Sequence, residues 1–225
     1  MSVQKNIIGI SLVELMISVA LSIFLSAAIV DVTLTASRVN RQIQLISEMV
    51  ENGRFLGQLL NTELSLAGFY GWLKARPIIS GTVPDRCTEI TVADLTKALS
   101  FPVDGIDDAP KDQIICSGDR LLAGTDVLVI RRASTDSVTS TIGLVGSQHY
   151  MQADGSSLTL AIGSNDKSFN QTQKDGVTPA PIRAFSQVIY YVSEDHVFKR
   201  RRLLEGTYTR AEPLIEGVDD FQVEY

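Results

Sequence analysis

A nearly uninterrupted apolar segment, "GISLVELMISVALSIFLSAAIV" (residues 9–30), constrains the fold of this chain more than any other feature. Residues 10–30 reach the length of about 20 residues that a helix needs to cross the hydrocarbon core of a membrane. Glu14 is the only charged residue in the segment. A charged side chain at the centre of a bilayer costs about 2.5–3.5 kcal/mol, so this glutamate needs an explanation.

Three interpretations of the apolar segment are open. It is a cleavable secretory signal with Ser26, Ala27 and Ala28 at the cleavage site, a plain membrane anchor, or an anchor that is processed at its front edge. Glu14 weighs against the first interpretation, because an acidic residue in the apolar core of a signal opposes insertion.

An amphipathic pattern continues the apolar segment. Apolar residues recur at helical spacing and polar residues fill most positions between them; the apolar set is Val32, Val39, Ile43, Ile46, Val50, Leu56, Leu60 and Leu64. No proline precedes Pro77, so both segments can belong to one helix. Residues 10–66 would then span roughly 85 Å. Gly68 and Gly71 predict the end of this helix.

The N-terminal residues resemble the prepilin motif of type IV pilins. A polar leader, "MSVQKNIIG", ends in Gly9, the hydrophobic Ile10 follows, and Glu14 comes four positions later. The resemblance implies that a prepilin peptidase cuts after Gly9 and that Ile10 is then N-methylated. The family usually has phenylalanine at the position of Ile10 and more than the single lysine, Lys5, in its leader. The isoleucine points away from a major subunit and toward a minor pilin.

The resemblance suggests a purpose for Glu14. Cleavage after Gly9 would create a cationic amine on Ile10, one helical turn from the glutamate. Both charges are poorly solvated in hydrocarbon, so we expect the Glu14 carboxylate to pair with such an amine, in its own chain or in a neighbouring subunit. Glu14 would then set the axial register of stacked helices. The alternative is a glutamate that reaches the lipid headgroups without a partner.

Several later stretches resemble the PilW-like minor pilins, which are related to the GspJ-type pseudopilins of type II secretion. They are "ENGRFLGQLLNTELSLAGFYG", "GTDVLVIRRAS", "VIYYVS" and "EPLIEGVDDFQVEY". These matches extend the resemblance over most of the chain.

The remainder of the chain predicts β structure. Segments rich in β-branched and aromatic residues lie between turn signals, at residues 126–132, 139–145, 157–162, 187–192, 197–204 and 219–225. Two of them should form a hairpin with Ser193 to His196 at its tip, and the polar residues 163–181 should form an exposed loop. The predicted fold class is α+β and pilin-like, with a long N-terminal α-helix, membrane-spanning in its first half, packed on a mainly antiparallel β-sheet.

This prediction divides the chain into four parts. They are a prepilin leader (1–9), the transmembrane and polymerisation half of the helix (10–30), its amphipathic half (31–68) and a globular β-rich pilin domain (69–225). Phe221, Val223 and Tyr225 alternate with polar residues up to the last position. We therefore expect the last strand, and with it the domain, to be truncated at the C-terminus.

Two cysteines, Cys87 and Cys116, follow the helical region. If the domain is exported, we expect them to form a disulfide that contributes roughly 3–4 kcal/mol by loop closure. In a cytosolic domain they would remain reduced, buried thiols.

A basic run, Lys199 to Arg202, raises the question of nucleic-acid binding. Side chains on a strand alternate between its faces, so the run does not form one patch for DNA phosphates. An edge strand protected by charge is the preferred interpretation. The net charge of −6 also argues mildly against nucleic acid as the main partner.

The sequence contains no convincing metal or catalytic motif. Asp104, Asp107 and Asp108 lack the spacing of a calcium-binding loop, which favours a solvated acidic turn. His149 and His196 have no cysteine or histidine at metal-ligand spacing. No nucleophile elbow, P-loop or dinucleotide fingerprint is present. We expect no enzymatic activity, no cofactor, no metal and no small-molecule substrate.

The resemblance therefore implies a minor pilin that supports pilus biogenesis, adhesion or twitching motility. Its partners would be prepilin peptidase, the inner membrane, and other major and minor pilins bound through the N-terminal helix. Two alternatives remain, a type II secretion minor pseudopilin and a membrane-anchored module that binds a ligand or DNA.

The location follows from the same motif. Before assembly the chain would cross the bacterial inner membrane once, with a periplasmic globular domain, and afterwards it would lie in the pilus fibre. Arg38 and Arg41 follow the span while only Lys5 precedes it, which is opposite to the positive-inside rule. The leader motif and the cysteine pair nevertheless favour export.

Overall fold

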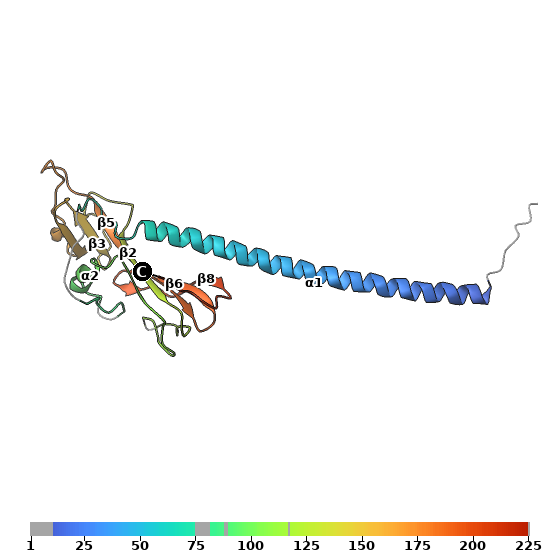
Figure 1. Ribbon diagram of the computed structural model, residues 1–225. Helices are drawn as coiled ribbons and strands as arrows, with labels where there is room; N and C mark the ends of the chain where they lie inside the picture. Colours follow the sequence, from blue (N-terminus) through green and yellow to red (C-terminus); the bar gives the residue numbers. More distant parts are fainter. Residues whose placement is uncertain (1–10, 75–81, 88–89, 117, 225) are drawn as a thin grey trace, which may run out of the picture. The chain divides into compact units, whose positions relative to one another are not determined.

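The computed structural model describes residues 11–74, 82–87, 90–116 and 118–224 (Figure 1). The chain divides into two compact units, Met1–Gly57 and Gln58–Tyr225. A long N-terminal apolar helix precedes a mainly antiparallel sheet. The predicted α+β class is thus confirmed, with a pilin-like layout.

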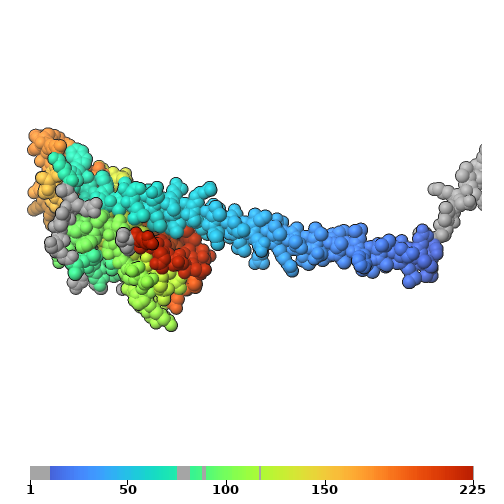
Figure 2. All heavy atoms as spheres, in the orientation of Figure 1, coloured from blue at the N-terminus to red at the C-terminus, as the bar shows by residue number. Residues whose placement is uncertain are grey.

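Helix α1 (Leu12–Ser65) contains 54 residues and begins in the first unit. It continues without a break through residues 30 and 31, where the sequence changes from apolar to amphipathic. Ser18, Ser22, Thr33 and Ser37 donate their hydroxyls to backbone carbonyls four residues earlier, which satisfies these polar groups on the helix itself. Figure 2 shows all heavy atoms of this helix, blue at its first residues.

Among the described residues, the second unit contains a sheet of eight strands in which every pairing is antiparallel. The strands are β1 (Val103–Ile106), β2 (Val127–Ala133), β3 (His149–Ala153), β4 (Leu158–Ile162), β5 (Ile182–Ser193), β6 (Val197–Leu204), β7 (Thr207–Tyr208) and β8 (Glu212–Glu216). The main path runs β1-β2-β5-β3-β4, and β6 joins β5 to β7 and β8. The twelve-residue β5 is long enough to pair with β3 near its start, β2 in its middle and β6 near its end.

Four predicted strands are confirmed as β2, β4, β5 and β6. The hairpin is also confirmed, because Ser193 pairs with Val197 across its tip. Residues 139–145 are wrong as a strand: they form turns and bends in which Ile142 is 91% exposed and Gly143 has a φ of +90°. The segment has the composition of a strand but no neighbouring strand along which to pair.

The described part of the last predicted strand, residues 219–224, is also irregular rather than β. Its backbone forms single hydrogen bonds to Asp126 rather than a strand ladder. The Phe221 carbonyl accepts from the Asp126 N–H, and the Val223 N–H donates to the Asp126 carboxylate. The sequence patterns missed β1, β3, β7 and β8, because these strands are short, polar or interrupted by Gly105 and Pro213.

The predicted loop, residues 163–181, is confirmed as mostly irregular, with one short 3-10 helix η1 (Asp166–Ser168). The sequence patterns did not predict a short helix, α2 (Val92–Ala98). Thr91 is its N-cap, and the Thr91 hydroxyl accepts a hydrogen bond from the Asp94 N–H.

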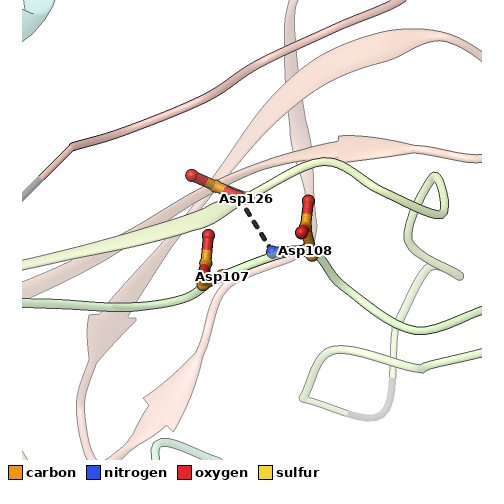
Figure 3. Close-up of side chains that lie close together, drawn as sticks. All are labelled: Asp107, Asp108 and Asp126. Atoms are coloured by element: carbon orange, nitrogen blue, oxygen red, sulfur yellow. Dashed lines mark hydrogen bonds between the residues drawn. The ribbon is translucent and has the colours of Figure 1, made fainter.

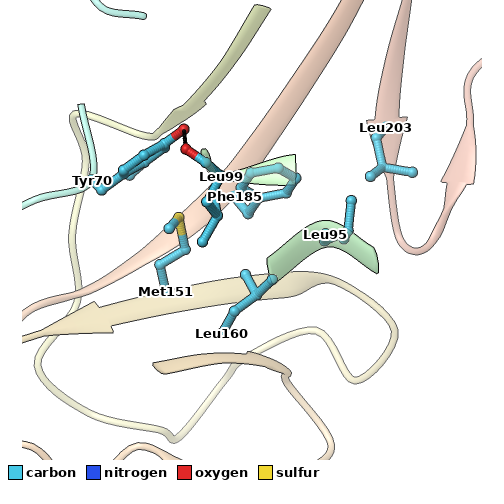
Figure 4. Close-up of a cluster of buried hydrophobic side chains, with 8 residues drawn as sticks. Tyr70, Leu95, Leu99, Met151, Leu160, Phe185 and Leu203 are labelled. Atoms are coloured by element: carbon cyan, nitrogen blue, oxygen red, sulfur yellow. Dashed lines mark hydrogen bonds between the residues drawn. The ribbon is translucent and has the colours of Figure 1, made fainter. Parts of the chain in front are cut away.

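Helix α2 covers one of the hydrophobic cores of the second unit (Figure 4). Leu95 on α2 and the C-cap Leu99 pack with side chains from β2, β3, β4, β5 and β6; the cluster is Tyr70, Leu95, Leu99, Ala133, Met151, Leu160, Phe185 and Leu203. The Tyr70 hydroxyl donates to the Leu99 carbonyl at 2.8 Å, which satisfies the polar end of a buried side chain.

A buried arginine lies within this sheet. Arg131 on β2 is 1% exposed. Its guanidinium donates to the Gln187 side chain at 2.6 Å, to the Phe101 carbonyl at 2.7 Å and to the Asp104 carboxylate at 3.2 Å. Arg86 binds the same carboxylate through two nitrogens. Asp104 is therefore a buried counter-ion on β1, and its assignment to a solvated acidic turn was wrong.

The end of α1 is joined to β2 within the second unit. Glu63 forms an ion pair with Arg132 at 3.0 Å, and both side chains are largely buried. Gly68, with a φ of +74°, follows the last helical turn and donates its N–H to the Arg131 carbonyl. Two residues further on from Arg131, the Ala133 N–H donates to the Phe69 carbonyl. Helix and sheet are thus connected by an ion pair and two backbone hydrogen bonds.

We expect Asp104→Ala to lower the free energy of unfolding of the second unit by about 3–5 kcal/mol, because it leaves the buried Arg131 charge uncompensated. Denaturant unfolding followed by the fluorescence of Trp72, the only tryptophan, measures this change. Arg120→Ala is the matched control, since Arg120 pairs with Asp112 at the surface and should contribute no more than about 1 kcal/mol. Equal losses in the two variants would contradict the assignment.

Candidate functional site

The predicted processing and assembly residues lie at the N-terminus. Gly9 and Ile10 fall outside the described residues. Glu14 lies in the first turn of α1 with its side chain exposed. Its backbone carbonyl accepts a hydrogen bond from Ser18 at 2.8 Å. No side chain in the described part of the chain pairs with the Glu14 carboxylate, so this charge is available to a group from elsewhere.

Helix α1 is long and apolar enough to cross a membrane. Its apolar side chains are turned outward in the first unit: Leu12 is 75% exposed and Phe24 is 83% exposed. Exposure of such side chains to water is unfavourable, whereas the hydrocarbon of a membrane would cover them. The helix can therefore anchor the protein in a membrane.

The two cysteines are joined in the structure. Cys87 and Cys116 form a disulfide with an S–S distance of 2.02 Å. The disulfide packs in a hydrophobic cluster that contains Ile115, Leu121, Val129 and Tyr191. It thereby ties the segment that precedes α2 to the long connection between β1 and β2.

The disulfide also positions the neighbouring arginine. Arg86 precedes Cys87 and reaches the Asp104 carboxylate at 2.6 Å. The Arg86 carbonyl in turn accepts a hydrogen bond from the Tyr208 hydroxyl at 2.8 Å. The covalent link therefore holds the second cation beside the carboxylate that neutralises Arg131.

The basic run on β6 is engaged within the protein. Arg200 and Arg202 both bind Glu212 on β8, at 2.8 and 3.0 Å. Lys199 pairs with Asp119 at 3.1 Å, on the other face of the sheet. Arg201 donates to the backbone carbonyls of Ile115, Cys116 and Thr209. These contacts leave no common cationic surface for DNA phosphates.

The position of β6 corrects the edge-strand interpretation. β6 pairs with β5 on one side and with β7 and β8 on the other, so it is an interior strand. Its charges therefore do not protect an open edge. They connect the sheet to β8 and to the connection between β1 and β2, which a local sequence pattern does not indicate.

An acidic cluster contains Asp107, Asp108 and Asp126, whose carboxylate oxygens lie within 4.8 Å of one another (Figure 3). Asp126 is buried and its carboxylate accepts hydrogen bonds from the backbone N–H groups of Asp108 and Val223. Asp107 and Asp108 are exposed. The buried member thus holds the irregular C-terminal segment against the loop, which is a structural role.

The two histidines differ. His149 on β3 is 3% exposed, and burial lowers the pKa of its imidazole. His196 lies in the β5–β6 turn with a φ of +59° and contacts Asp219 at 2.9 Å. Among the described residues neither histidine belongs to a cluster of three or more metal-ligating side chains.

Sequence reasoning missed the residues that join the helix end to the sheet. The two arginines of "VIRRAS" stand in an apolar strand, and this is the signal that could have indicated them. Arg131 and Arg132 point to opposite faces of β2, where they bind Asp104 and Glu63 respectively. Their partners are distant in sequence, so only the folded chain identifies them.

Comparisons of this chain with protein families, with curated proteins and with solved structures found no match.

We expect Cys87→Ser combined with Cys116→Ser to lower the free energy of unfolding by about 3–4 kcal/mol, because the unfolded chain regains the entropy of the closed loop. Urea unfolding of the oxidised protein and of the double variant measures the difference. Wild-type protein treated with a reductant should unfold at the same urea concentration as the double variant. A difference below about 1 kcal/mol would show that the disulfide contributes little.

We expect the Glu212 carboxyl to contribute to the loss of folding stability at low pH. Hydrogen bonds from Arg200, and then from Arg202, lower the pKa of the Glu212 carboxyl to about 2. A carboxylate with a lowered folded-state pKa stabilises the fold above its unfolded-state pKa, and this contribution is lost as the pH falls from about 4.5 to 2. Glu212→Gln should remove this part of the pH dependence, by less than about 1 kcal/mol because the pair is partly exposed. Unfolding free energies measured at pH 7 and at low pH test it; an unchanged pH dependence would contradict it.

Proposed function

We propose that this chain is a minor pilin of a type IV pilus, cut by prepilin peptidase after Gly9, N-methylated on Ile10, and incorporated into the fibre through its N-terminal helix. The observation that carries the proposal is the unbroken helix Leu12–Ser65, with Glu14 in its first turn, ahead of an antiparallel sheet. The prepilin-like motif would be the substrate for cleavage after Gly9, and the helix would pack against other subunits during assembly.

The outward-facing apolar side chains of α1 suit two successive environments. In the inner membrane they would be covered by lipid. In a fibre they would be covered by the helices of neighbouring subunits, which are equally apolar. Transfer between these environments keeps apolar surface away from water throughout, so it costs little hydrophobic free energy. Specific association then has to come from packing and from the few polar groups.

Glu14 is the polar group that can supply this specificity. Its carboxylate lacks a partner among the described residues, and cleavage after Gly9 would create an amine nearby in the chain. A neighbouring subunit at the correct axial offset would bring an amine and a carboxylate together in a medium of low polarity. Pairing removes the desolvation penalty of both charges, whereas a wrong offset leaves both unpaired.

The junction between the end of α1 and β2 suits a subunit held by its helix. In such a subunit any pull on the globular part passes through the residues after Ser65. The Glu63–Arg132 ion pair and the backbone bonds of Gly68 and Phe69 fix this exit to a strand inside the sheet. The load would therefore reach the sheet core rather than a flexible linker.

The alternative of a DNA-binding module loses its main support, because the cations of β6 are bound to carboxylates and backbone carbonyls. A type II secretion pseudopilin would use the same helix and the same glutamate. In our proposal the globular unit lies in the periplasm before assembly, and the partners are other pilins.

We expect Glu14→Ala to leave membrane insertion intact and to reduce the amount of the protein in sheared pili at least about tenfold, because the neighbouring amine loses its buried partner. Quantitative immunoblots of membrane and sheared-pilus fractions, in a bacterium that makes type IV pili, measure both quantities. Glu48→Ala, an exposed carboxylate on the same helix, is the control and should behave as wild type. Recovery of Glu14→Ala in pili at the wild-type level would refute the registry role.

A second variant separates processing from pairing. Gly9→Phe should block cleavage, leave residues 1–9 attached and exclude the protein from pili, while membrane insertion is retained. If wild-type protein is absent from sheared pili and its loss impairs protein secretion instead, the pseudopilin alternative holds.

A further inference from the structure

A cavity of about 550 Å³ lies at the surface of the second unit, in a place that no sequence motif indicated. Three segments form it: the chain after α1, the turn between β3 and β4, and the loop before β5. The lining residues are Trp72, Lys74, Asp154, Gly155, Gln173, Lys174 and Asp175. Figures 1 and 2 show residues near 175 (orange) beside residues near 70 (teal) at one end of this unit. The volume is in the range of small-molecule sites, about 300–1,000 Å³.

The only tryptophan of the chain lines this cavity. Trp72 is 49% exposed, which is unusual for the largest aromatic side chain in a unit that buries many smaller ones. The backbone around it is fixed, because the Lys74 N–H donates to the Gly155 carbonyl at 3.2 Å. Gly155 has a φ of +99°, and a Cβ at this position would lie 3.5 Å from the Trp72 carbonyl. The hydrogen bond between Lys74 and Gly155 therefore links the tryptophan segment to this turn.

Two carboxylates in the cavity are held in fixed orientations. Asp154 accepts hydrogen bonds from the backbone N–H groups of Ser156 and Ser157, at 2.8 and 2.7 Å, and from both serine hydroxyls, so both of its oxygens are engaged within the turn. Asp175 accepts from the N–H of Thr178 at 2.9 Å and from its hydroxyl. These hydrogen bonds lower the pKa of both carboxyls. The Ser157 N–H contributes most to the lowering at Asp154, and the Thr178 hydroxyl contributes most at Asp175. Both side chains are therefore ionised and oriented, and Asp175, with three donors, has room for one more.

The charges of the cavity balance. Lys74 and Lys174 are without an ion pair in the described part of the chain, and they offset the charges of Asp154 and Asp175. An anionic ligand would meet the two carboxylates, and a cationic one would meet the two ammonium groups. The groups present instead suit a neutral molecule with several hydroxyls and one apolar face.

We propose that this cavity binds a neutral saccharide, with the C–H face of a sugar ring against the indole of Trp72 and its hydroxyls on the side chains of Asp175 and the two lysines. Carboxylates accept from sugar hydroxyls, and ammonium groups donate to them. The flat indole covers the apolar face of the ring, as aromatic side chains do in other amphipathic contacts. The site would function whether or not the chain enters a pilus.

The fluorescence of Trp72 tests this directly, because no other tryptophan contributes. The full chain in nanodiscs or in a detergent without sugar headgroups is titrated with a panel of neutral monosaccharides and disaccharides. A saturable change in emission with at least one neutral sugar is expected, unchanged between pH 5 and pH 8 because both carboxyls stay ionised. Matched panels of acidic sugars, amino sugars and short peptides are titrated in parallel.

Variants then locate the site. Asp175→Asn keeps an acceptor for the turn but removes the charge, and it should weaken binding of the responding sugar at least about tenfold. Trp72→Ala should have an effect of the same size, measured by calorimetry, and Trp72→Phe should restore part of the affinity. Ile142→Ala, a change of an exposed residue outside the cavity, is the control and should bind as wild type.

Three outcomes would overturn the assignment. They are the absence of a fluorescence change with every neutral sugar, binding that survives Trp72→Ala unchanged, and a response confined to charged sugars or peptides.

Discussion

The charge of Arg131 is the constraint on which the sheet unit depends. An arginine cannot lose its proton at any physiological pH, so burying this side chain inside the sheet requires partners for the whole guanidinium. Asp104 from β1, Gln187 from β5 and the Phe101 carbonyl after α2 supply them. Arg86 shares the Asp104 carboxylate and is held there by the neighbouring disulfide. Each of the three guanidinium nitrogens of Arg131 thus has a partner, and a network with a missing partner would be more costly than an apolar core.

The neighbouring residue, Arg132, extends this arrangement to the helix. Consecutive side chains on a strand point to opposite faces, so β2 binds Asp104 on one face and Glu63 on the other. A single strand thus carries both the buried cation that Asp104 neutralises and the cation that binds the last turn of α1. This connection is what the proposed function requires, because a subunit held by its helix needs a rigid attachment to its globular part.

The proposed assembly and the proposed sugar site use different parts of the chain. Assembly depends on the apolar surface of α1 and on Glu14, whose carboxylate has no partner in the described part of the chain. The cavity around Trp72 belongs to the second unit and is built by turns whose aspartates are fixed by backbone hydrogen bonds. A protein that is both anchored and able to bind a saccharide would be suited to surface contact.

The sequence alone determined the features that depend on local pattern. The apolar run, the helical spacing and the absence of proline specified the long helix, and the alternation around Ser193 to His196 specified the β5–β6 hairpin. Residues 139–145 had the same local signal but no neighbouring strand, and they did not form β structure. Only the tertiary structure decided which charges meet, because Asp104, Arg131 and Gln187 are brought together by strand pairing across long sequence separations. The same long-range pairing made β6 an interior strand, buried His149 and assembled the cavity around Trp72. The spacing of apolar residues depends on positions that are close in the sequence, so it can be recognised from the sequence. The partner of a buried charge depends on which distant segments the fold brings together.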